Sequence, residues 1–185
     1  GLGSTINGTV VNQGATLELV GGISTLGEAV ALYGLLSNPS GSNTLNGTLT
    51  LNAGAAIDVA SGSVLVLKAF QANGPFTKTG TGWMRLTTDP NGYGVMTVRE
   101  GTAEVATGTM DASVVVNGGA TLVATVANAF NDSTTRIQLD AGSTYLLRQW
   151  DQVGGLAGAG TITQDTPASA WLCIGANNFS ETYSW

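Results

Sequence analysis

Short runs of alternating apolar and polar residues recur along the chain, and each begins at a turn that contains glycine. The phrase "VNQGATLEL" at 11–19 returns as "LNAGAAIDV" at 51–59, "VNGGATLVA" at 116–124 and "LDAGSTYLL" at 139–147, with looser copies "VASGSVLVL" at 59–67 and "VREGTAEV" at 98–105. Alternation with a period of two predicts strands with one buried face. Asn or Asp followed by Gly suits a tight turn, because these residues tolerate positive φ.

The spacing of the turns predicts how these strands are arranged. The turn glycines are Gly14, Gly54, Gly62, Gly101, Gly119 and Gly142. Their gaps of 18, 23, 39 and 40 residues are close to one or two steps of about 20, and the gap of 8 fits two corners of one step. This period is typical of a solenoid, in which stacked steps share a core that no single step can bury. We therefore predict an all-β parallel β-helix (β-solenoid) with about 20 residues per rung, forming one domain over 1–185.

The alternation also assigns the side chains that should point into this core. The inward set comprises Val11, Leu17, Leu19, Leu51, Ile57, Val59, Leu65, Leu67, Met84, Leu86, Val98, Val105, Val116, Leu122, Ile137, Leu139, Tyr145 and Leu147. At the turns, Asn12, Asn52, Asn117 and Asp140 are expected to stack, with side chains that bind turn amides. The segment "GEAVALYGLLSN" at 27–38 fits a short helix or a strand bent at Gly34, and we favour the strand.

Composition and charge narrow the classes of partner. The chain has 27 Gly, no His and 12 Asp and Glu against 6 Lys and Arg, so it offers no basic patch for nucleic acid. No apolar run approaches the roughly 20 residues of a membrane-spanning helix. Cys173 lacks an intramolecular partner and is expected to be a buried small side chain. Because the sequence starts at Gly1, we expect a processed or excised segment of a longer protein.

The sequence offers little for catalysis. Without His there is no Ser-His-Asp or Cys-His constellation, and one Cys cannot build a structural zinc site. Asp and Glu are thinly spread, although β-helix folds can cleave polysaccharides with paired carboxylates. We therefore expect no catalytic, cofactor or metal site. A glycan-binding surface stays open as an alternative: Trp83 lies on the outward phase beside Arg85 and is the candidate exposed aromatic contact.

Residues 76–105, "FTKTGTGWMRLTTDPNGYGVMTVREGTAEV", resemble the passenger-associated repeat of autotransporter passenger domains. The matching positions are Lys78, Gly80, Gly82, Leu86, Tyr93, Gly94, Thr97, Val98, Gly101 and Thr102. Trp83 and Met84 stand where smaller residues are commoner, and Ala103 replaces the usual Leu. The segments at 43–67 and 154–163 resemble strand pairs and glycine-rich rung openings of large bacterial surface proteins. The resemblance implies a right-handed β-helix, export through a Gram-negative envelope, and a structural or adhesive role.

The two ends of a solenoid present unpaired edges. Ile6 and Val10 at one end and Phe179, Tyr183 and Trp185 at the other are the candidate assembly edge. Either the rest of a longer surface protein covers these edges, or identical subunits stack head to tail into a filament. We thus expect an extracellular, non-catalytic stalk, adhesin or fibre segment. With no His, its stability should change little in mild acid.

Overall fold

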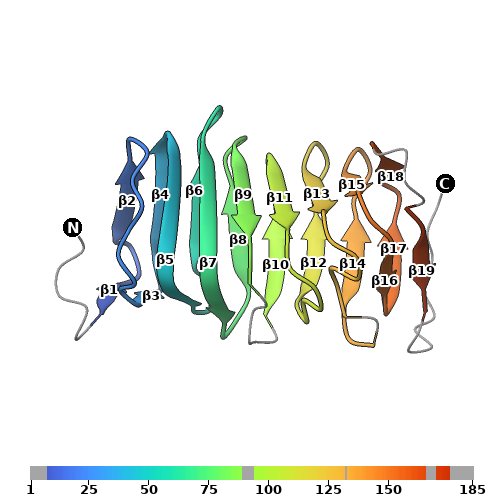
Figure 1. The fold of residues 1–185 in the computed structure, drawn as a ribbon, viewed down its shortest axis with the longest axis horizontal. Coiled ribbons are helices and arrows are strands. Elements are labelled where there is room, and N and C mark those ends of the chain that lie inside the picture. The colour runs from blue at the N-terminus through green and yellow to red at the C-terminus, as the bar shows by residue number, and fades with distance from the viewer. Residues whose placement is uncertain (1–7, 89–93, 132, 166–169, 176–185) are drawn as a thin grey trace.

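The chain folds into a stack of strand-lined coils. The structure, a computed structural model, describes residues 8–88, 94–131, 133–165 and 170–175. Within these ranges every regular element is a β-strand, and every pairing between strands is parallel. Figure 1 shows the coils side by side along the long axis, with β1 and β19 at opposite ends. The predicted fold class, an all-β parallel β-solenoid, is confirmed.

The described strands form three sheets. The nine-stranded sheet contains, in spatial order, β1 (Thr9–Val11), β3 (Val30–Leu32), β5 (Ser42–Leu51), β7 (Val64–Ala72), β9 (Trp83–Leu86), β11 (Thr102–Val105), β13 (Thr121–Ala124), β15 (Thr144–Leu147) and β18 (Thr161–Gln164). The eight-stranded sheet runs from β2 (Thr16–Val20) through β4 (Leu35–Ser40), β6 (Ala56–Val59), β8 (Phe76–Thr79), β10 (Val95–Val98), β12 (Ser113–Val116) and β14 (Arg136–Leu139) to β17 (Gly155–Gly158). A third sheet pairs β16 (Asp151–Val153) with β19 (Leu172–Ile174).

Pairing within the nine-stranded sheet shows that each coil has three sides. The long strands β5 and β7 each turn a corner, so their two halves belong to different sides. β3 pairs with residues 49–51 of β5, which in turn pair with residues 70–72 of β7. β9 instead pairs with residues 64–67 of β7. The third side continues in the Met110–Phe130 bridge and in the β16–β19 pair.

The coil length agrees with the predicted period. Paired residues lie 19 apart between Trp83 and Thr102 and again between Thr102 and Thr121. The step lengthens to 23 residues between Thr121 and Thr144 and shortens to 17 between Thr144 and Thr161. The variation arises in the loops, which can change length without disturbing the strand register.

The predicted inward set forms the core. All of its members except Leu17 are buried. Leu17 is half-buried and packs against the core from β2, which is the terminal strand of its sheet among the described residues. Rows of inward side chains run along the stack, and one of them joins Leu36, Ile57, Lys78, Val98 and Val116.

The glycine turns were predicted correctly, but their hydrogen bonding was not. All six predicted turn glycines have positive φ, from 64° at Gly101 to 86° at Gly119. The side chains of Asn and Asp were expected to bind turn amides. Instead the backbone carbonyl of Asn117 accepts from Ala120 N, and that of Asp140 accepts from Ser143 N. The side chains are free to link coils, and Asn117 Nδ2 donates to Asp140 Oδ2 at 2.7 Å.

Two further local predictions have opposite outcomes. The segment at 27–38 is extended, as favoured: β3 and β4 flank a bend at Gly34, where a Cβ would lie 2.3 Å from Ala15 O. The prediction for Cys173 is wrong, because this residue is exposed. It pairs with Gln152, which lies between the buried Asp151 and Val153 and therefore points outward.

Candidate functional surfaces

The predicted aromatic contact, Trp83, belongs to a polar cluster on the outer face of the nine-stranded sheet. Its ring is half-buried, and its indole Nε1 donates to Glu104 Oε2 at 2.8 Å. Arg85 Nε lies 3.3 Å from Glu104 Oε1, and Glu104 is only 5% exposed. The outward phase of Trp83 is as predicted. The indole N–H of Trp83 is already bound to Glu104, and because the ring is half-buried only part of its face is available for a ligand.

Of the predicted assembly residues, the structure places one. Val10 lies on β1, the terminal strand of its sheet, and is largely exposed. Ile6, Phe179, Tyr183 and Trp185 lie outside the described residues, as does Tyr93 of the repeat motif. The N-terminal coils carry other exposed aliphatic side chains that sequence reasoning did not single out: Val20, Ile23 and Leu26.

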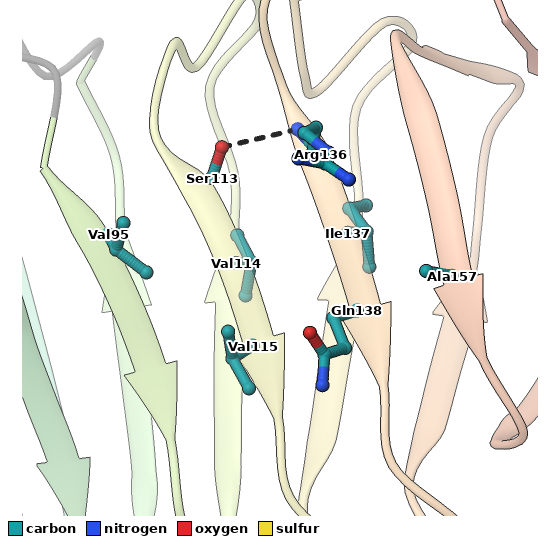
Figure 2. Close-up of a pocket in the computed structure, with 8 residues that line it drawn as sticks. All are labelled: Val95, Ser113, Val114, Val115, Arg136, Ile137, Gln138 and Ala157. Carbon is teal, nitrogen blue, oxygen red and sulfur yellow. Dashed lines mark hydrogen bonds between the residues drawn. The ribbon is translucent and has the colours of Figure 1, made fainter. Parts of the chain in front are cut away.

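A shallow groove of about 270 Å³ crosses the outer face of the eight-stranded sheet over β10, β12, β14 and β17. Figure 2 shows Val95 and Val115 on one side and Arg136 and Gln138 on the other, with Ala157 beyond them. Arg136 N donates to Ser113 Oγ at 3.4 Å. The groove forms because Arg136 and Gln138 on β14 have longer side chains than the lining residues of the neighbouring strands. The shortest of those is Ala157 on β17.

The described residues of this groove place polar side chains beside apolar ones. None of them is a carboxylate, whereas most glycosidases use a pair of carboxylates across the scissile bond. The nearby Asp140 has both oxygens engaged, since Gln138 Nε2 donates to Oδ1 at 3.1 Å and Asn117 Nδ2 donates to Oδ2. The groove therefore offers a guanidinium, an amide and a hydroxyl over an aliphatic floor.

A pair of stacked tryptophans lies near the C-terminal end. The rings of Trp150 and Trp171 are nearly parallel, at 10°, with centroids 5.2 Å apart. Trp171 is 51% exposed, and Asp151 N donates to its carbonyl at 2.9 Å. Sequence reasoning missed this pair. The signal was present, because the two residues are 21 positions apart, about one coil, and so fall at equivalent places in successive coils.

Beside this stack an apolar pocket of about 240 Å³ opens at the end of the core. Leu147, Ile162 and Leu172 line it, and Thr163 and Gln164 contribute polar atoms. Ile162 and Leu172 are half-buried and pack against the core, whereas Ile174 on the same strand as Leu172 is exposed. Within the part of the chain that the structure describes, the pocket thus lies at the C-terminal end of the inward rows.

Lys78, a motif residue, lies inside the solenoid. Its side chain is fully buried, and Nζ donates to the carbonyls of Thr79 (3.0 Å), Gly80 (2.6 Å) and Glu100 (3.0 Å). Burial lowers the pKa of Lys78 to about 8, against the opposing attraction of Asp58 and Glu100. The ammonium thereby binds carbonyls from two successive coils at one corner. This position is structural and inaccessible to a ligand.

A second buried polar group lies in the third side. The Tyr145 hydroxyl donates to Asp151 Oδ2, while Phe130 N and Gln152 N donate to Asp151 Oδ1 at 3.2 and 3.0 Å. Burial raises the pKa of Asp151 to about 6, although all of these hydrogen bonds favour the ionised form. Burial and the neighbouring carboxylate also raise the pKa of Tyr145 well above its usual value.

Within the described ranges, no group of three or more Cys, Asp or Glu side chains is placed to hold a metal ion. Nor does that part of the chain contain a helix long and apolar enough to cross a membrane. No protein-family model matches the chain, and neither a curated protein nor a solved structure matches it. The autotransporter resemblance therefore stays a prediction that rests on the residues quoted for it.

Proposed function

We propose that this chain is a non-catalytic structural β-solenoid, a stiff segment of a stalk, adhesin or fibre on the outside of a Gram-negative bacterium. The observation that supports this role is the continuity of the core. One cluster of buried apolar side chains extends from Val11 in the first coil to Leu156 in the last. A body built in this way transmits force along its axis, because each coil is hydrogen-bonded and packed to the next.

The turns support the same reading, since their residues are engaged in holding coils together. Lys78 binds two coils, Asn117 and Asp140 join two others, and Arg148 makes a bidentate pair with Asp165, with Nη2 to Oδ2 at 2.9 Å. The extracellular location rests on the repeat motif of residues 76–105, which resembles exported passenger domains.

Protease treatment of intact source cells tests the location. A surface stalk should lose peptides from this chain while a cytoplasmic marker protein stays whole. Release of these peptides only after lysis would exclude a surface role. Pulling single molecules from both ends tests the mechanical part: we expect unfolding in steps of about 20 residues, the coil length seen between Thr77 and Thr97. Extension at negligible force would exclude a stiff spacer.

A glycan-binding surface is the second candidate, favoured by the stacked tryptophans. Sugar rings pack on exposed aromatic faces, and Trp171 has such a face while the indole N–H of Trp83 is occupied. Affinity electrophoresis through a panel of bacterial polysaccharides tests this function. Retardation that disappears in Trp171→Ala but persists in Trp83→Ala would establish the C-terminal site. Retardation lost only in Trp83→Ala would move the site to the originally predicted contact, and no retardation would reject this candidate.

A further inference from the structure

The N-terminal coil ends one particular row of inward side chains. Ser24 bridges to Thr44, which places Ile23 in register with Asn43. From Asn43 the row continues through Leu65, Met84, Ala103, Leu122 and Tyr145 to Ile162. Its inner members are fully buried, whereas Ile23 at the N-terminal end is 43% exposed. By this register Ile23 falls on the inward phase, and its partial exposure indicates that the row has room for one more coil.

Among the described residues, no further strand follows the opposite end of the same row. Ile162 on β18 is half-buried and lines the apolar pocket with Leu147 and Leu172. In the neighbouring row of the eight-stranded sheet, Leu17 stands at the N-terminal end and Gly158 at the C-terminal end. If a second copy stacked on this end, its Leu17 would face Gly158, which has no side chain to obstruct it.

The backbone edges of the two ends are complementary in direction. Among the described residues, β18 and β17 have a strand on one side only, and so does β2 at the other end. An unpaired edge presents a row of N–H and C=O groups that can accept another strand. A second copy stacked head to tail would bring its strands up parallel, the pairing used throughout this chain. Head-to-head stacking would make them antiparallel.

We propose that the C-terminal coil of one copy binds the N-terminal coil of the next, with Ile23 of the second copy packing against Ile162 of the first. This inference rests on the structural role proposed above and names its partner, another copy of the same chain. The contact is heterologous and does not close, so it generates filaments. The eight coils give an expected axial repeat of about 40 Å.

Sedimentation velocity over a range of concentrations, with negative-stain electron microscopy, tests the proposal. The wild-type chain should form linear species whose length grows with concentration. Ile23→Asp and Ile162→Asp should each remain monomeric, because each places a charge at one end of the row. Val20→Asp and Thr161→Asp are the matched controls: Val20 is 48% exposed and Thr161 is exposed, both lie on the outward phase of their strands, and both variants should assemble as wild type does.

Mixing the two blocked variants separates this geometry from others and checks their folding. Ile23→Asp retains a working C-terminal end and Ile162→Asp a working N-terminal end, so an equimolar mixture should yield heterodimers and nothing longer. A wild-type chain that stays monomeric overturns the proposal, as do controls that block assembly equally, which would indicate lateral contact. Neither outcome affects the stiff-stalk role, which is measured on single molecules by pulling.

Discussion

At the scale of single residues, the solenoid is specified by the few polar side chains in its core. Lys78 interrupts an aliphatic row between Ile57 and Val98, yet all three donors of its ammonium find carbonyls. Asn43 is likewise buried and binds both the coil before it and its own turn. Buried polar groups with a full set of partners favour a single packing, because any shift in register leaves them unsatisfied.

We expect Lys78→Met to destabilise the protein by about 1–3 kcal/mol, since three partly buried carbonyls lose a charged donor. Lys68→Met is the matched control, because Lys68 lies on the exposed face of β7 and should change the free energy of unfolding little. Urea denaturation followed by circular dichroism measures both. Equal stability of the two variants would show that the buried ammonium contributes nothing net.

Asp151 should make stability depend on pH in the direction opposite to ordinary acid denaturation. Its pKa is about 6 when folded against 3.8 as the usual value, so the folded state binds the extra proton between these limits. The stabilisation from protonated Asp151 is complete below pH 4 and is lost as the pH rises through 6, by up to about 3 kcal/mol. Mild acid should therefore stabilise this coil. The absence of His alone predicted little change in stability, and the titration of Asp151 gives that change a direction.

The measurement is urea denaturation of the wild type and Asp151→Asn at intervals from pH 4 to pH 7.5. The asparagine retains the acceptor for Phe130 N but cannot titrate. The stability of wild type relative to this variant should fall as the pH rises. Parallel curves over the whole range would mean that Asp151 titrates normally in the folded state.

At the scale of elements, the strands and turns were predictable because both depend on local sequence. Period-two alternation identified the core, and Asn-x-Gly phrases located the tight turns. The features that were not predicted depend on how residues in the loops are placed relative to neighbouring coils. β16, β19 and the Trp150–Trp171 stack follow loops of different length, and loop length sets which residues become neighbours. Lys78 shares the inward phase of Phe76, two residues before it, but it was not placed among the inward residues, because a charged side chain is seldom buried.

The motif glycines act through close coil-to-coil contact. A Cβ at Gly82 would lie 2.2 Å from Ala60 O and 2.8 Å from Ser63 O, both backbone atoms of the preceding coil. We expect Gly82→Ala to force adjacent coils apart and to cost about 1–3 kcal/mol. Gly27→Ala is the control, because nothing lies within 4 Å of its added methyl group, and it should be neutral or slightly stabilising. Thermal melts compare them; similar midpoints would contradict the close-contact argument.

At the scale of the whole molecule, stability should be distributed along the axis. Each coil contacts only the coils before and after it, so the protein approximates a one-dimensional chain of units. Interior coils have two neighbours, whereas the described terminal coils, which contain β2 and β18, have only one. Opening should therefore begin at the ends and proceed inward, with the slowest amide exchange in the central strands.

Asn43→Ala offers a sharp test of this distribution. Asn43 Oδ1 accepts from Gly22 N and Ile23 N at 2.9 and 2.7 Å, and its Nδ2 donates to Leu19 O and Ser40 O. Its loss should speed hydrogen exchange in the first coils while β11 and later strands keep wild-type rates, since they share no contact with it. Asn46→Ala, which removes an exposed amide bound to Ser24 and Thr25, should have little effect, because water replaces it. Uniform acceleration along the chain would instead show that all coils open as one cooperative unit.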